Sequence, residues 1–141
     1  MLDKEMVQRK LFLNQQELER LRGFAHLKIE EIANDPGKYA ACERYLERLI
    51  SRAIDINQHI IAEKGSVALS VKKYHDTFLV LAELGVYPKD FAEKIAPSAG
   101  LRNALVHDYN NIDKEMLQKS IKEAIWEYNE YSKYILAFML L

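Results

Sequence analysis

The amino-acid sequence predicts an all-α protein, an antiparallel bundle of about four long helices plus a short connecting helix. Three prolines and five glycines divide the 141-residue chain, and the segments between them carry apolar residues at helical spacing. No stretch alternates apolar and polar residues for long enough to predict a β-strand. The length fits a single domain over residues 1–141, large enough to bury roughly 68% of the surface that the unfolded chain exposes.

The first helix is expected from about Asp3 to Asn34. Its apolar residues recur at helical spacing, with charged residues on the other sides: Leu11, Leu18, Leu21, Ala25 and Ile32. A helix of about thirty residues is long for a globular protein, which suggests that it also packs on something outside its own bundle. The helix is expected to stop before Asp35, which would cap a second helix with Pro36 at its first position.

The second helix is expected from about Pro36 to Glu63. A regular apolar stripe predicts that one face lies in the core: Cys42, Leu46, Leu49, Ala53, Ile56 and Ile60. Cys42 lies on this stripe and is therefore expected to be inert. As the one cysteine of the chain, it excludes an internal disulfide and suits a reducing compartment.

The remaining helices are shorter until the last. A third is expected from about Val71 to Leu84, led by Tyr74, Phe78 and Leu81, and Gly85 closes it. A short fourth segment follows Pro88, and the stretch 97–100 interrupts the chain before the next helical segment. The last helix is expected over about 113–140, with Asp113 as its N-cap.

The best candidates for a functional site lie in residues 101–109, which read Leu-Arg-Asn-Ala-Leu-Val-His-Asp-Tyr. On an ideal helix, at about 100° per residue, Leu101 and Leu105 share one side and can anchor the segment. Arg102 and Tyr109 nearly superimpose, whereas Arg102 and His107 lie roughly 140° apart. These two side chains can converge on one small group only if the helix loosens or a second subunit completes the site.

The pattern Arg-Asn-x3-His-x-Tyr, from Arg102 to Tyr109, resembles the signature of the HEPN superfamily, in particular of HepT-like ribonuclease toxins. The preceding segments are similar to that family's helices in the same order. They are the second helix around 47–60, the stretch Tyr-His-Asp-Thr-Phe-Leu-Val-Leu-Ala-Glu-Leu-Gly, and Phe-Ala-Glu-Lys-Ile. The resemblance covers roughly residues 44–113, and the first helix and the tail are not diagnostic.

The resemblance implies an endoribonuclease that works as a homodimer, with two copies of the motif lining a groove between subunits. RNA is cleaved when a base removes a proton from a 2′-hydroxyl, which then attacks the adjacent phosphorus. His107 suits the role of base, and Arg102 offers a planar fork for two phosphate oxygens. Asn103 is expected to orient the histidine or the phosphate, and this chemistry requires neither a metal nor a cofactor.

The resemblance also implies a partner in a HepT/MntA-type toxin–antitoxin system. This partner is a small nucleotidyltransferase antitoxin that transfers AMP to the motif tyrosine, here Tyr109. The added phosphates would bring negative charge beside Arg102 and block the groove to RNA.

Each candidate residue, taken alone, also has a structural interpretation. Arg102 could cap a helix end or pair with Asp108, and His107 could be a hydrogen-bonded structural histidine. Asp55 and His59 form an i, i+4 pair on the second helix, either a simple polar pair or a support for the motif across the bundle. The alternative function is a non-catalytic helical dimer that binds a nucleotide or a partner protein.

Composition limits the other possibilities. Charged residues make up 29% of the chain but leave a net charge of −1, so any RNA must bind in a local groove instead of an overall basic field. The sequence lacks a Glu-x-x-His di-iron motif, a cysteine-built zinc site and a phosphate-binding glycine loop. Charges interrupt the N-terminal region, and the apolar tail from Tyr134 is far shorter than the ~20 residues of a membrane span. The protein is expected to be soluble and cytoplasmic.

Overall fold

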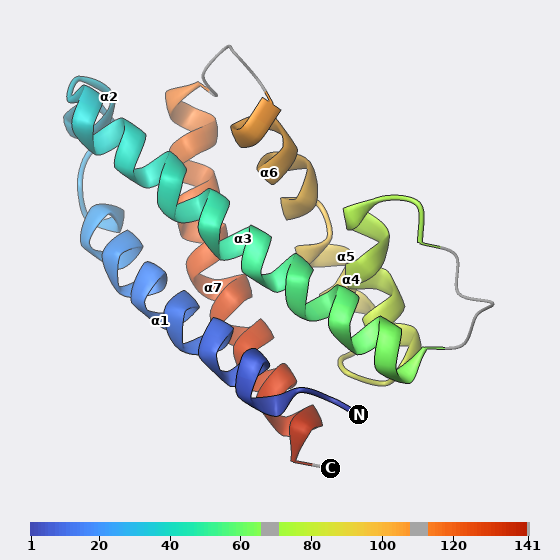
Figure 1. Ribbon diagram of the computed structural model, residues 1–141. Helices are drawn as coiled ribbons and strands as arrows, with labels where there is room; N and C mark the ends of the chain where they lie inside the picture. Colours follow the sequence, from blue (N-terminus) through green and yellow to red (C-terminus); the bar gives the residue numbers. More distant parts are fainter. Residues whose placement is uncertain (66–70, 108–112, 141) are drawn as a thin grey trace.

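The computed structural model describes residues 1–65, 71–107 and 113–140, and every regular element in these ranges is a helix (Figure 1). The prediction of an all-α protein is confirmed. In chain order the helices are α1 (Lys4–Ala25), α2 (Ile29–Ala33), α3 (Pro36–Lys64), α4 (Tyr74–Glu83), α5 (Lys89–Ile95), α6 (Ser98–His107) and α7 (Lys114–Met139).

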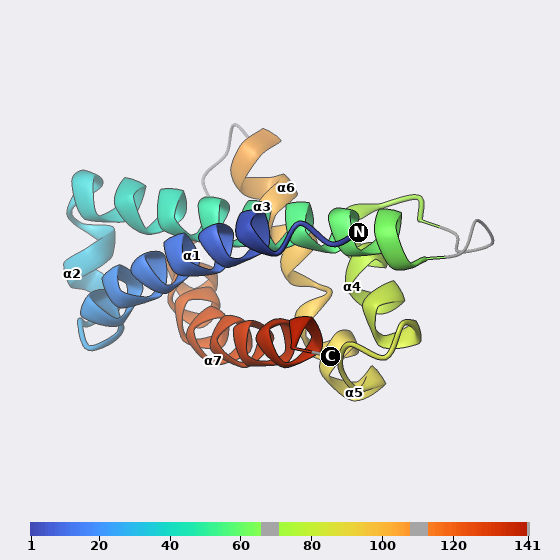
Figure 2. The ribbon, with the colours of Figure 1, turned by 60° about the horizontal axis from the view of Figure 1, so that its bottom comes forward.

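Three long helices form the body of the bundle. The helices α1, α3 and α7 have 22, 29 and 26 residues and pack on one another (Figures 1 and 2). Because α1 runs antiparallel to α3 and α7, the two termini lie at the same end of the molecule (Figure 1). The shorter α4 and α6 pack on α3, and α5 bridges α4 and α7 on the side away from α1.

The predicted apolar stripe of α3 is the centre of the core. Cys42, Leu46, Leu49 and the other residues of the stripe are fully buried. Burial raises the pKa of the Cys42 thiol to about 11, and the charge of Glu43 adds to the rise. Since the thiolate is the reactive form of cysteine, this location supports the expectation that Cys42 is inert.

The prediction of one continuous helix from Asp3 to Asn34 is wrong. The first helix ends at Ala25, and the chain turns through His26 and Leu27 before α2 begins. The side chain of Glu31 accepts a hydrogen bond from the backbone N–H of Lys28 at 3.2 Å and so caps the new helix. The turn directs Ile32 into the core, where it is 1% exposed, and this burial favours the break.

The helix starts follow local capping. Asp35 accepts hydrogen bonds from the N–H groups of the next helix, and Asp113 accepts one from the N–H of Met116, so both predicted N-caps are confirmed. The start of α4 comes at Tyr74, three residues later than predicted. Asp76 accepts hydrogen bonds from the backbone N–H groups just before α4, of Lys72 and Lys73, at 3.1 and 3.2 Å.

A chain of buried hydrogen bonds joins α7, α3 and α4. The Tyr131 hydroxyl donates to Asn57 Oδ1 at 2.6 Å, and Asn57 Nδ2 donates to Thr77 Oγ1 at 3.1 Å. Thr77 Oγ1 in turn donates to the backbone carbonyl of Tyr74 at 2.6 Å. Tyr131, Asn57 and Thr77 are all fully buried. This network fixes the first turn of α4 against the core.

Within the described residues, no helix combines the length and the apolar character that a membrane span requires.

Candidate functional site

The candidate motif lies on α6, which begins directly after Pro97. Ser98 holds this start in place, since its hydroxyl donates to the carbonyl of Ile95 at 2.7 Å and lies 2.6 Å from the hydroxyl of the buried Tyr128. Leu101 and Leu105 pack against the core, as the helical spacing predicted. The described part of α6 reaches His107, so the motif residues Asp108 and Tyr109 lie outside the described residues.

Arg102 of the motif is held by contacts with two other helices. Its Nε donates a hydrogen bond to Ser51 Oγ of α3 at 3.1 Å. Its guanidinium carbon lies 5.2 Å from the centre of the Tyr74 ring, at the first position of α4. Because the bond to Ser51 uses Nε, a bidentate contact with a phosphate would use the two Nη groups. The two contacts give the Arg102 side chain a defined orientation.

Asn103 and His107 are both exposed and lie one helical turn apart on α6. They are accessible to a large substrate such as RNA. Among the described contacts, Arg102 meets Ser51 and Tyr74, and none joins it to His107. The described part of α6 stays helical up to His107, so the roughly 140° between the arginine and the histidine persists in one subunit.

Asp55 and His59 meet the start of the chain. Lys10 Nζ of α1 lies 3.1 Å from a carboxylate oxygen of Asp55, and the N–H of Asp3 donates to His59 Nε2 at 2.8 Å. Both contacts fasten α1 to α3. Asp55 also lies one turn after Ser51 on α3. No described contact joins it to the motif, so its supporting role stays a prediction.

The sequence interpretation missed Ser51 and Tyr74. A serine on a helix surface carries no sequence signal of a functional role. The sequence pattern places Tyr74 first among the apolar residues of the third helix, which predicts burial. Tyr74 is instead 38% exposed. Both residues come close to Arg102 only through the packing of α3, α4 and α6, so the sequence alone does not identify them.

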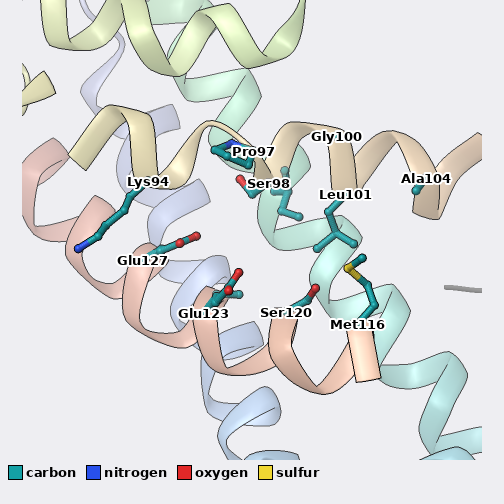
Figure 3. A pocket seen from close by; sticks show the side chains of 12 residues that line it. Lys94, Pro97, Ser98, Gly100, Leu101, Ala104, Met116, Ser120, Glu123 and Glu127 are labelled. Atoms are coloured by element: carbon teal, nitrogen blue, oxygen red, sulfur yellow. The ribbon is translucent and has the colours of Figure 1, made fainter. Parts of the chain in front are cut away.

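The opposite face of α6 lines a separate cavity of about 350 Å³ (Figure 3). Leu101 and Ala104 of α6 form one wall, and residues of α7 that include Glu123 and Glu127 form the other. Burial raises the pKa of the Glu127 carboxyl to about 7, Glu123 adds to the rise, and Lys94 opposes it. Arg102 does not line this cavity, so the two faces of α6 have different environments.

The family model described as "Ribonuclease HepT-like" matches residues 14–135. The chain belongs to the HepT-like ribonuclease family. It is 32% identical over 126 residues to a "tRNA nuclease HepT" of Aphanizomenon flos-aquae, which spans 87% of this HepT-like chain and 82% of the relative. The predicted family and ribonuclease class are therefore confirmed.

Solved structures share this HepT-like fold. A tri-AMPylated HEPN toxin of Shewanella oneidensis, in complex with an MNT antitoxin, aligns with a TM-score of 0.80 at 20% identity and covers 97% of this chain and 99% of that chain. YutE of Bacillus subtilis, a cytosolic protein of unknown function, aligns with a TM-score of 0.82 at 17% identity. The alignment covers 98% of this chain and 91% of the YutE chain. At these identities the likeness establishes the fold alone.

Proposed function

We propose that this HepT-like chain is an endoribonuclease toxin that cleaves tRNA at a site built from Arg102 and His107. The observation that carries the proposal is the environment of the motif. Arg102 is held by Ser51 and Tyr74, while Asn103 and His107 are exposed on the same helix. The relative from Aphanizomenon flos-aquae, named as a tRNA nuclease, supports tRNA as the substrate class.

The proposed reaction uses the 2′-hydroxyl of the RNA as the nucleophile. His107 removes its proton, the 2′-oxygen attacks the adjacent phosphorus, and the bond to the 5′-oxygen breaks. The leaving 5′-oxygen takes up a proton, so the products are a 2′,3′-cyclic phosphate and a 5′-hydroxyl. Arg102 stabilises the charge that develops on the phosphate oxygens, and Asn103 orients the histidine or the phosphate. Asp55 supports this region from α3.

A cleavage assay tests this function. Purified wild-type chain should cut a tRNA transcript, and Arg102→Ala should reduce the rate by at least about 100-fold, since it removes the group that stabilises charge in the transition state. A chain that binds the transcript or a nucleotide and leaves the RNA intact would favour the alternative, a non-catalytic helical dimer.

The active form is expected to be a homodimer. Arg102 and His107 diverge on one α6, so a groove between two subunits would bring the arginine of one copy near the histidine of the other. The interface should bury more than about 1,000 Å². Light scattering at micromolar concentration should give twice the mass of the 16.4 kDa chain. A monomer under these conditions would contradict the shared site.

The proposed partner is a nucleotidyltransferase antitoxin that adds AMP to Tyr109. The Shewanella oneidensis toxin, which is tri-AMPylated in its complex with an MNT antitoxin, supports this regulation. Each added phosphate carries negative charge that would compete with RNA for the guanidinium of Arg102.

Tyr109→Phe should keep most of the ribonuclease activity and become refractory to the antitoxin. The ring and both proposed catalytic groups remain, whereas the AMP acceptor is lost. Incubation of wild type with the nucleotidyltransferase and ATP, followed by mass spectrometry, should locate AMP on Tyr109. AMP on another residue, or silencing of Tyr109→Phe as readily as wild type, would refute the role of Tyr109 and leave the ribonuclease function standing.

A further inference from the structure

Two residues outside the motif hold the motif arginine. We propose that Ser51 and Tyr74 are positioning residues for Arg102, which keep its guanidinium oriented toward the scissile phosphate without reducing its charge. This inference rests on the proposed ribonuclease function. Both contacts come from other helices, α3 and α4, so the orientation of Arg102 is a property of the packed bundle and not of α6 alone.

The hydrogen bond to Ser51 fixes one edge of the guanidinium. Nε of Arg102 lies 3.1 Å from Ser51 Oγ. A serine hydroxyl is neutral, so it orients the arginine and leaves the positive charge for the substrate. A carboxylate in the same place would compete with the phosphate for that charge. The carboxylate one turn further along α3, that of Asp55, is instead paired with Lys10.

The ring of Tyr74 packs against the guanidinium of Arg102. The 5.2 Å between the guanidinium carbon and the ring centre is within the range of a cation–π contact, which also leaves the charge uncompensated. Arginine stacks on aromatic faces because its guanidinium is flat. Together, the bond at Nε and the ring face restrain the Arg102 side chain from two helices.

The backbone of Tyr74 is held by the buried network of α3, α4 and α7. The backbone carbonyl of Tyr74 accepts a hydrogen bond from the hydroxyl of Thr77. This hydroxyl accepts one from the amide nitrogen of Asn57, and the amide oxygen of Asn57 accepts one from the hydroxyl of Tyr131. The first turn of α4 is therefore fixed from the core side, while 38% of Tyr74 remains exposed beside Arg102. This arrangement is typical of a residue that positions a functional group, because support comes from the core and the working face meets solvent.

Cleavage kinetics on the full chain test the proposal. At saturating tRNA, Ser51→Ala and Tyr74→Leu should each lower the cleavage rate by about tenfold or more, because small misplacements of a catalytic group are costly. Tyr74→Phe keeps the ring face and should stay within about threefold of wild type. The effect should fall mainly on kcat, since the charge that attracts RNA is unchanged.

A matched control removes a similar contact between α1 and α3, which involves neither Arg102 nor the two residues that hold it. Arg20 lies over the ring of Tyr45, with its guanidinium carbon 5.6 Å from the ring centre. Tyr45→Leu should therefore leave the cleavage rate unchanged below the unfolding temperature. Wild-type rates for Ser51→Ala and Tyr74→Leu, or an equal loss for Tyr74→Phe and Tyr74→Leu, would overturn the positioning role. An equal loss for Tyr45→Leu would do the same, because it would indicate a general effect on the fold.

A second measurement does not depend on catalysis. In NMR spectra of the wild-type chain, the Arg102 Nε–H proton should exchange slowly with solvent. Ser51→Ala should speed this exchange, and Tyr74→Leu should change the chemical shift of the same resonance by removing the ring current. If both changes occur while wild type leaves RNA intact, the proposed function fails and the positioning contacts stand. If neither variant alters the Arg102 resonance, the positioning inference fails, whatever the activity.

Discussion

His107→Ala should reduce RNA cleavage by about 100- to 10,000-fold, the range that loss of a general base produces. His107 is exposed in the last turn of α6, so its truncation should change the free energy of unfolding by no more than about 0.5 kcal/mol. The measurement is the single-turnover rate of tRNA cleavage beside a urea unfolding curve of the same preparation.

The matched control for this variant is His26→Ala. His26 is also exposed and follows the end of a helix, but it belongs to the turn between α1 and α2. Its loss should leave the cleavage rate unchanged. If His107→Ala cleaves like wild type, or if both variants lose activity together, His107 is not the base.

Asn57→Ala should have the largest effect on stability, a loss of about 2–4 kcal/mol in the free energy of unfolding. Asn57 is fully buried and is the central member of the network that joins α7, α3 and α4. Its truncation leaves a cavity and removes the amide partners of Tyr131 and Thr77. Urea unfolding monitored by circular dichroism measures the loss.

The neighbouring Gln58 provides the control, since it is exposed on the same helix. Gln58→Ala should stay within about 0.5 kcal/mol of wild type. A loss below about 1 kcal/mol for Asn57→Ala would show that the buried network contributes little. Because Thr77 links this network to Tyr74, the variant should also slow cleavage at temperatures where the chain remains folded.

Local patterns in the sequence were enough to predict most of the helices. The stripe from Cys42 to Ile60 identifies the buried face of α3, and the caps Asp35 and Asp113 mark helix starts, because each signal depends on residues close in the chain. Gly85, with a φ of 84°, follows α4 where a left-handed residue was needed.

The break between α1 and α2 depends on tertiary packing and could not be predicted in this way. The segment from Gly23 to Asn34 has no proline, and its local pattern is compatible with a continuing helix. Burial of Ile32 against the rest of the bundle favours the turn, and this gain appears only when α3 and α7 are in place. Because the first helix ends at Ala25, its length no longer indicates that it packs on something outside the bundle.

In the candidate site, too, the residues of a local motif could be predicted, whereas those that depend on tertiary packing could not. Arg102, Asn103, His107 and Tyr109 lie within one short motif, so the sequence alone singles them out. Ser51 and Tyr74 lie far from the motif in the chain and carry no motif of their own. Their contacts with Arg102 arise because α4 and α6 both pack on α3.

The chemical ends of the cleaved RNA test the central claim most directly. Purified wild-type chain is incubated with a tRNA transcript in the presence of a chelator, and mass spectrometry identifies the new termini. Attack by the 2′-hydroxyl, with His107 as base and Arg102 on the phosphate, predicts a 2′,3′-cyclic phosphate and a 5′-hydroxyl, formed without added metal. Products with a 3′-hydroxyl and a 5′-phosphate, or cleavage that returns only when magnesium is added, would contradict it.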